Sequence, residues 1–221
     1  MRDAAQVTGI VLKTMPVGEY DKVLTVLTKE RGKISGFVRG ARKQNNRLMA
    51  ASDLFVFGRF MLYEGRSSYT IADIEVLDYF ASLHRDPQLA CLGMYFLELA
   101  DYYTRENNDE YEFMVLLFRA LQQLTAKDPD TAFIRAVYEC KAMIVSGEFP
   151  GVPNVMRVSD ATMAAVQFLQ GCQAKDAFKF RLEKEALSEL IDVACADLKK
   201  IVHHQFKSLA FLDDFAVENQ K

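Results

Sequence analysis

The sequence predicts an α+β protein in which a small five-stranded β-barrel is followed by an all-helical domain. In the first eighty residues, short runs rich in Val, Ile, Thr, Phe and Tyr are separated by turns that contain Gly, Pro or Asn. From about residue 84 onward, apolar residues recur every three or four positions, which is the spacing of amphipathic helices. This change of period predicts two domains, residues 1–80 and residues 81–221.

The barrel is expected to contain five strands, over residues 6–13, 22–28, 33–38, 54–63 and 69–77. The fourth run is apolar at successive positions, as expected if one face fills a barrel and the other face is covered. The fifth run alternates, which places Ile71 and Asp73 on one face and Ile74 on the other. Closing these strands into a barrel removes the exposed edges of the sheet.

The helical domain is expected to contain five helices. Apolar stripes mark three of them over residues 89–103, 113–124 and 133–144, and two more follow over about 160–170 and 183–206. An acid precedes a proline at Asp86-Pro87 and again at Asp128-Pro129, and such a pair is typical of a helix start. Ser159 is predicted to cap the fourth helix.

The composition belongs to the globular class, because half of the residues are hydrophobic and 26% are charged. No run reaches the roughly 18 apolar residues that a membrane-spanning helix needs, so we expect no membrane partner. The first residues include an acid at position 3 and no long apolar stretch, unlike a secretory signal. The sequence therefore predicts a cytoplasmic protein.

The residues that usually bind metals are too dispersed to predict a metal site or a cofactor. The four cysteines are Cys91, Cys140, Cys172 and Cys195, and no two are close enough in sequence to form a zinc knuckle. His203 and His204 are adjacent in the predicted last helix, where positive charge complements the helix dipole. We therefore predict no metal, no cofactor and no disulfide.

Catalytic motifs are also missing from the sequence. It contains no HExxH, GxSxG or GxGxxG pattern. Gly32, Gly36 and Gly40 recur every fourth residue without the spacing of a phosphate-binding loop, and we interpret them as turn and barrel-bend glycines. The protein is therefore predicted not to be an enzyme.

The charge distribution indicates a nucleic-acid partner, although the net charge is only −3. Residues 1–80 hold 12 basic and 9 acidic residues, whereas the remainder holds 15 and 21. Seven basic residues fall between positions 29 and 47, where Glu30 is the one acid: Lys29, Arg31, Lys33, Arg39, Arg42, Lys43 and Arg47. Clustered cations bind a DNA backbone by releasing its counterions, so these seven are predicted to bind DNA.

This prediction requires the seven side chains to share a surface and to lack carboxylate partners. Aromatic side chains on the same barrel face could stack on bases, and Phe37, Tyr63 and Tyr69 are the candidates, with core packing as the simpler interpretation. A protein-interaction scaffold with no direct DNA role remains the alternative. A nucleic-acid-processing enzyme would need acids at the basic face, where Asp53 and Glu64 are the nearest.

Ordered segments along nearly the whole chain resemble the bacterial RecO family of DNA repair and recombination mediators. In the first eighty residues they run from Thr8 to Thr14, Gly18 to Thr28, Gly32 to Arg42 and Leu62 to Arg66, followed by Tyr69-Thr70. Near the C-terminus the similar segments are Lys207-Ser208-Leu209 and Phe211-Leu212. The resemblance implies that the N-terminal barrel has the oligonucleotide/oligosaccharide-binding (OB) fold and that it binds single- and double-stranded DNA.

The resemblance further implies strand annealing, help in loading recombinase on DNA coated with single-strand-binding protein, and RecR as a partner. It also implies contact with the acidic, apolar C-terminal tail of single-strand-binding protein. Such a tail needs a cation beside an apolar groove, and Arg119, Arg135 and Lys141 are candidates, with ordinary surface charge as the simpler interpretation. Many RecO proteins carry a four-cysteine zinc module, but residues 147–159, at the corresponding place, contain no cysteine.

Overall fold

The computed structural model describes residues 4–65, 68–209 and 211–212, so Arg66 of the segments above lies outside the described residues. The chain divides into two compact units. One comprises Met1–Arg85 and Ala100–Met114, and the other comprises Asp86–Leu99 and Val115–Lys221. The last residues of the first long helix, the loop after it and the start of the next helix thus belong to the N-terminal unit.

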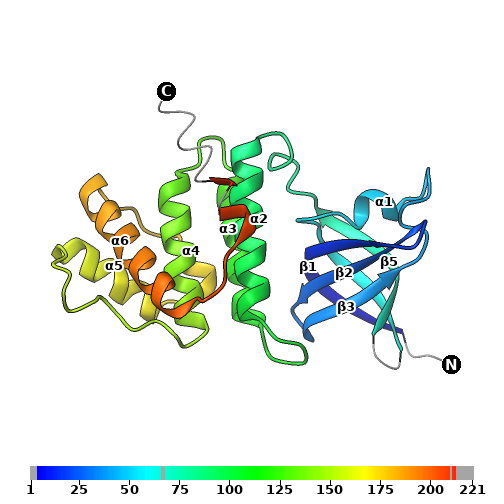
Figure 1. Cartoon of the computed structure of the whole chain (residues 1–221), viewed down its shortest axis with the longest axis horizontal. Helices are drawn as coiled ribbons and strands as arrows, with labels where there is room; N and C mark the ends of the chain where they lie inside the picture. Colours follow the sequence, from blue (N-terminus) through cyan, green and yellow to red (C-terminus); the bar gives the residue numbers. More distant parts are fainter. Residues whose placement is uncertain (1–3, 66–67, 210, 213–221) are drawn as a thin grey trace. The chain divides into compact units, whose positions relative to one another are not determined.

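The N-terminal unit contains the predicted five-stranded barrel (Figure 1). Its strands are β1 (Ala4–Val17), β2 (Asp21–Thr28), β3 (Gly32–Val38), β4 (Phe57–Glu64) and β5 (Tyr69–Asp78). They close in the order β1-β2-β3-β5-β4, and the β3–β5 pair is the parallel one. The predicted strands are all confirmed, although β1 is longer than expected and β4 begins three residues later.

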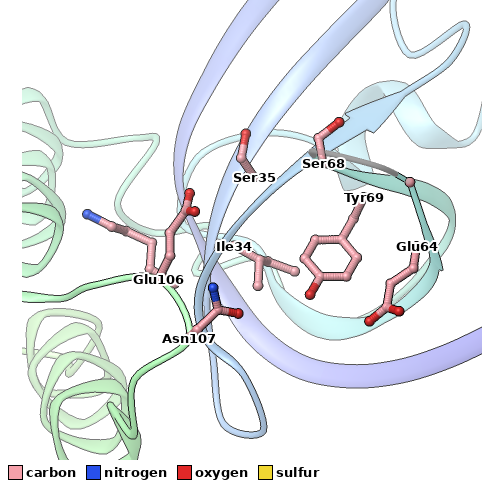
Figure 2. A pocket seen from close by; sticks show the side chains of 9 residues that line it. Ile34, Ser35, Glu64, Ser68, Tyr69, Glu106 and Asn107 are labelled. Carbon is pink, nitrogen blue, oxygen red and sulfur yellow. The ribbon is translucent and has the colours of Figure 1, made fainter.

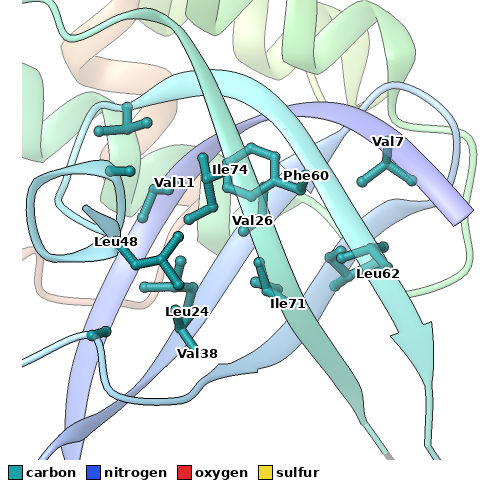
Figure 3. Close-up of a cluster of buried hydrophobic side chains, with 14 residues drawn as sticks. Val7, Val11, Leu24, Val26, Val38, Leu48, Phe60, Leu62, Ile71 and Ile74 are labelled. Atoms are coloured by element: carbon teal, nitrogen blue, oxygen red, sulfur yellow. The ribbon is translucent and has the colours of Figure 1, made fainter. Parts of the chain in front are cut away.

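The barrel interior is filled by the inward-facing apolar side chains of every strand (Figure 3). The predicted alternation fails in β5, because Ile71 and Ile74 are both buried in this core. Ile71 pairs with Leu62 and Asp73 pairs with Met61, so the residue between them has no partner on β4. This bulge exchanges the inward and outward faces of β5, which a simple alternation cannot predict.

Gly36 has the predicted role of a barrel glycine. A Cβ atom at this position would lie 2.7 Å from Cγ1 of Ile71 inside the barrel. Gly32 and Gly40 flank β3 with φ angles of +62° and +66°, a conformation that favours glycine. The three glycines therefore set the turns and the packing of β3, as the sequence predicted.

A short helix that the sequence did not predict, α1 (Leu48–Ala51), lies between β3 and β4. Leu48 and Ala51 of this helix belong to the barrel core. On the same helix, the carbonyl oxygen of Met49 accepts a hydrogen bond from Lys22 Nζ at 3.4 Å, and that of Ser52, just after it, accepts at 3.2 Å. The helix thus closes one end of the barrel.

The remaining elements are helical, as predicted. They are α2 (Pro87–Tyr103), α3 (Tyr111–Leu124), α4 (Thr131–Val145), α5 (Asp160–Gly171), the single-turn 3-10 helix η1 (Ala174–Asp176) and α6 (Lys184–Ile201). Within the C-terminal unit, α4 packs against both α5 and α6. Among the described residues, no helix is both long and apolar enough to span a membrane.

The helix boundaries confirm two predicted caps and correct two predictions. Asp86 Oδ1 accepts hydrogen bonds from the main-chain N–H groups of the first turn of α2, and Ser159 caps α5. The start predicted at Asp128 is wrong, because Asp130 caps α4 and accepts from Phe133 N at 3.0 Å. Helix α6 ends at Ile201 and not at residue 206, so the two adjacent histidines follow the helix and Lys199 and Lys200 occupy its last turn.

Candidate nucleic-acid interface

The seven predicted DNA-binding residues fall into two groups at opposite ends of β3. Lys29, Arg31 and Lys33 lie at the β2–β3 turn, whereas Arg39, Arg42, Lys43 and Arg47 follow β3. At about 3.3 Å per residue, the length of this strand separates the groups by roughly 20 Å. The sequence expectation of a single cluster is therefore not met.

Carboxylates neutralise three of the seven cations. Arg31 pairs with Glu64, and its Nη1 also donates to the Tyr69 hydroxyl at 3.1 Å. Lys33 Nζ lies 3.0 Å from Asp101 Oδ1. Arg47 Nη2 lies 2.7 Å from Asp73 Oδ1. Lys29 has no such pair among the described residues, and its Nζ lies over the ring of Tyr111.

The turn group borders a groove between β3, the β4–β5 hairpin and the loop after α2 (Figure 2). Its volume is about 230 Å³, and the side chains that line it include Ser35, Glu64, Tyr69, Glu106 and Asn107. A neighbouring groove shares Glu64, Tyr69 and Asn107 and adds Glu30 and Asp109. With several carboxylates on its walls, this region is poorly suited to a phosphate backbone.

The loop after β3 presents three cations, none of which forms an ion pair with a carboxylate of the described residues. Arg39, Arg42 and Lys43 are all exposed. The ion pairs of the described residues include none of the three. They therefore keep their charge available for an anionic ligand.

Hydrogen bonds fix this loop against the β1–β2 turn. The main-chain N–H of Arg42 donates to Tyr20 O at 2.8 Å, and its Nη1 donates to Gly18 O at 3.2 Å. Gly40 N donates to Asp21 Oδ1 at 2.8 Å. Lys43 Nζ lies 5.5 Å from the centroid of the Tyr20 ring, within cation–π range. The loop cations are thus held beside an exposed aromatic ring.

A row of apolar side chains leads across the outer face of the barrel to this loop. Met15 on β1 pairs with Val23 on β2, which pairs with Phe37 on β3, so the three share one face. Met15 is 58% exposed, Phe37 39% and Tyr20, in the adjoining turn, 45%. We call Met15, Tyr20, Phe37, Arg39, Arg42 and Lys43 the loop–strand surface.

Sequence reasoning identified only part of this surface. Phe37 was a predicted stacking residue and is exposed, whereas Tyr69 packs against the barrel core and Tyr63 is half-buried. Met15 and Tyr20 were missed, and the signal that could have found them was the β1–β2–β3 register. A hydrogen bond with Glu19, together with burial, raises the pKa of the Tyr20 phenol above its usual value, so it is neutral at pH 7.

The two acids considered for a processing enzyme are not brought together. Asp53 precedes β4 and accepts a hydrogen bond from the main-chain N–H of Leu54, whereas Glu64 ends β4 and pairs with Arg31. Within residues 4–65, 68–209 and 211–212, no three His, Cys, Asp or Glu side chains are grouped to hold a metal ion.

The three predicted partner-binding residues differ in their surroundings. Lys141 is only 3% exposed, and its Nζ donates to Leu169 O at 2.7 Å and to Cys172 O at 2.6 Å, at the C-terminal end of α5. This lysine therefore caps a helix in the interior. Arg135 lies beside Glu139 on α4, and Arg119 is exposed on α3.

A different cation adjoins an apolar patch in the C-terminal unit. Arg181 lies over the ring of Phe133, with 5.2 Å between Cζ and the ring centroid. Phe180 contacts Phe133 and Phe168 edge-on, at 5.2 and 5.3 Å between ring centroids. Phe168 is 38% exposed. We call Phe168, Phe180, Arg181 and the buried ring of Phe133 the aromatic patch.

Arg119 also influences the segment that carries this patch. The pKa of Asp176 is lowered by the hydrogen bond from Lys179 and, more weakly, by the charge of Arg119. Of the cations that lower this pKa, which include Lys175, Arg119 has the smallest effect. The sequence signal that could have found this site is the alternation of cations and an aromatic residue from Lys179 to Arg181.

Comparison with known proteins relates both units to one family. The family profile described as "Recombination protein O N terminal" matches residues 1–80. A protein of Acetivibrio thermocellus named DNA repair protein RecO is 21% identical, over 93% of this chain and 94% of its own length. Proteins of the same name from Bacillus pumilus and Bacillus subtilis are 30% and 34% identical, over 80% and 64% of this chain and 72% and 55% of their own lengths.

Proposed function

Since this chain belongs to the RecO family of DNA repair and recombination proteins, we propose that it is a non-enzymatic mediator that binds DNA through its loop–strand surface. On this proposal it anneals complementary strands and helps to load recombinase on DNA coated with single-strand-binding protein. The observation that carries the proposal is the set of three cations that have no carboxylate partner among the described residues, beside three exposed apolar side chains.

Each half of the surface has its own task in annealing. Arg39, Arg42 and Lys43 contact phosphates and release condensed counterions, which lowers the repulsion between two strands. Tyr20 and Phe37 offer ring faces on which bases stack while their Watson–Crick edges stay accessible. Contacts to the phosphate backbone can be made with single-stranded and with double-stranded DNA. Annealing forms no covalent bond, so no catalytic acid or base is required.

The test is a charge reversal, Arg39→Glu with Arg42→Glu and Lys43→Glu, measured by fluorescence anisotropy on labelled single-stranded DNA over a range of salt. Each lost phosphate contact lowers the slope of log affinity against log salt by about 0.7, so the triple variant should lose about 2. A control reverses three exposed lysines of the C-terminal unit, Lys127, Lys184 and Lys199. Equal affinities of the two triple variants would refute the assignment.

The same experiment separates the mediator from the scaffold alternative. A scaffold would not be retained on single-stranded DNA, and its partner binding would be insensitive to salt. Annealing of strands coated with single-strand-binding protein, with and without this chain, then tests the mediator step itself. In a separate assay of recombinase loading on the same coated strands, RecR should accelerate loading if it is a partner.

For the tail of single-strand-binding protein we propose the aromatic patch as the docking site. Arg181 supplies the cation beside an apolar surface that an acidic, apolar tail requires. Arg181→Glu should weaken binding of a labelled tail peptide at least tenfold, whereas Arg135→Glu, whose guanidinium already pairs with Glu139, should change it less. The opposite order would move the site to Arg135.

A further inference from the structure

Asp101, near the end of α2, bridges two lysines of the barrel surface. Its Oδ2 lies 2.5 Å from Lys13 Nζ on β1, and its Oδ1 lies 3.0 Å from Lys33 Nζ on β3. Lys33 Nζ also donates to the main-chain oxygen of Asp101 at 2.7 Å. One carboxylate therefore occupies the position between two ammonium groups that a phosphate would favour.

This position adjoins the loop–strand surface. Lys13 pairs with Thr25 on β2, which pairs with Ser35 on β3. The next row on the same face is Met15, Val23 and Phe37, because side chains two residues apart on a strand point the same way. A strand of DNA stacked on Phe37 would therefore pass within reach of Lys13.

The two lysines are unequally available. The Lys13 side chain is 57% exposed, whereas those of Lys33 and Asp101 are 16% and 20% exposed. Burial alone would raise the pKa of Asp101, but hydrogen bonds from Lys13 and Lys33 outweigh it and leave the pKa below its usual value. Asp101 is therefore ionised at neutral pH, and Lys13 is the partner from which another anion can displace it.

We propose that Lys13 is a phosphate-binding residue of this surface, and that Asp101 holds it until a DNA phosphate takes its place. Lys33, which also binds the main-chain oxygen of Asp101, keeps the carboxylate when Lys13 leaves it. The exchange is accessible because an exposed ion pair contributes little to stability, whereas the phosphate contact releases a counterion from DNA. The inference rests on the proposed function, since it needs DNA on the loop–strand surface.

Substitutions of the two members of this ion pair should change the affinity for DNA in opposite directions. If the pair were merely structural, both substitutions would act in the same direction. Asp101→Asn frees Lys13, and we expect the affinity for labelled single-stranded DNA to rise about two- to fivefold at low salt. Lys13→Gln removes a phosphate contact, and we expect a weaker affinity and a salt slope smaller by about 0.7. The double variant, with Asp101→Asn and Lys13→Gln, should not show the higher DNA affinity expected for Asp101→Asn alone.

Arg59 and Glu75 supply matched controls. They form an exposed ion pair between β4 and β5, and neither strand is a neighbour of β2 in the barrel. Glu75→Gln changes the net charge as Asp101→Asn does, and Arg59→Gln changes it as Lys13→Gln does. Both controls should bind like the unmodified protein. Thermal unfolding shows whether each variant is folded. If Asp101→Asn does not fold, the DNA affinity of Lys13→Gln alone tests the inference, because this substitution leaves the Asp101–Lys33 pair intact.

The outcomes separate this inference from the proposed function. If the unmodified protein does not bind DNA, or if reversing Arg39, Arg42 and Lys43 changes nothing, the proposed function fails. If that reversal abolishes binding but Asp101→Asn and Lys13→Gln behave like their controls, the inference alone is overturned. Weaker binding by both variants would likewise overturn it and make the ion pair a structural one.

Discussion

The main-chain N–H of Arg42 donates a hydrogen bond to the carbonyl oxygen of Tyr20 at 2.8 Å. This contact ties a loop that follows β3 to the turn between β1 and β2, which lies 22 residues earlier. Because Lys43 also lies over the Tyr20 ring, the cations and the aromatic side chain are positioned together. The loop–strand surface is thus set by contacts within the barrel before any ligand arrives.

The exposed ring of Tyr20 should contribute to single-stranded DNA binding. Base–aromatic stacking is worth about 1–3 kcal/mol per base, so Tyr20→Ala should weaken binding to single-stranded DNA about tenfold. Duplex binding should change less, because paired bases are not free to stack on the ring. Anisotropy titrations with both DNA forms check this, and Tyr79→Ala, at a similarly exposed tyrosine after β5, is the control.

Gly36→Ala should destabilise the barrel. The added Cβ would lie 2.7 Å from Ile71 Cγ1 and 2.8 Å from Cδ1, and overpacking of this kind costs about 1–3 kcal/mol. Combining it with Ile71→Ala removes both close atoms, so the double variant should be more stable than the sum of the single effects predicts. Chemical denaturation measures this coupling. Gly171→Ala, in a helix and with no neighbour within 4 Å, should not lower stability.

Asp197 should make the stability of the protein depend on pH. It is fully buried on α6, and neither carboxylate oxygen has a hydrogen-bond partner within the described part of the chain. Burial raises its pKa, although Lys200 opposes the shift. A raised folded-state pKa means that stability is full below the unfolded pKa of about 4 and is lost as the pH rises through the folded value.

The substitution Asp197→Asn tests this direction of the change in stability with pH. At pH 7 the variant should be more stable than the unmodified protein, and the difference should vanish near pH 4. Denaturation curves over this pH range measure it. Asp192→Asn, at an exposed position on the same helix, should show no such trend. A variant that is less stable at every pH would mean that the carboxylate has a stabilising role.

Lys141→Met should destabilise the C-terminal unit and leave tail binding intact. The lysine donates to two carbonyl oxygens at the end of α5, and leaving such buried acceptors without a donor costs about 1–3 kcal/mol. A lower unfolding midpoint with unchanged binding of the tail peptide is the expected result. A large loss of peptide affinity in the folded variant would restore Lys141 to the partner site.

The sequence predicted the barrel and the helices because local period and turn residues determine them. It misplaced the inward face after Ile71, since a bulge depends on the pairing of two strands. It also could not foresee which cations are neutralised: Asp101 lies 88 residues from Lys13, and only the fold brings them together. The burial of Lys141 could not be foreseen for the same reason, because its hydrogen-bond partners come from another helix.

Helix α1 has a consequence for the conformational freedom of the basic loop. The basic loop is bound to the β1–β2 turn at its start, and at its other end it runs into Leu48, which is fixed inside the barrel. A segment anchored at both ends loses little freedom when a ligand settles on it, so association carries a small ordering penalty. On the proposed function, DNA would therefore meet a loop whose conformation is already set.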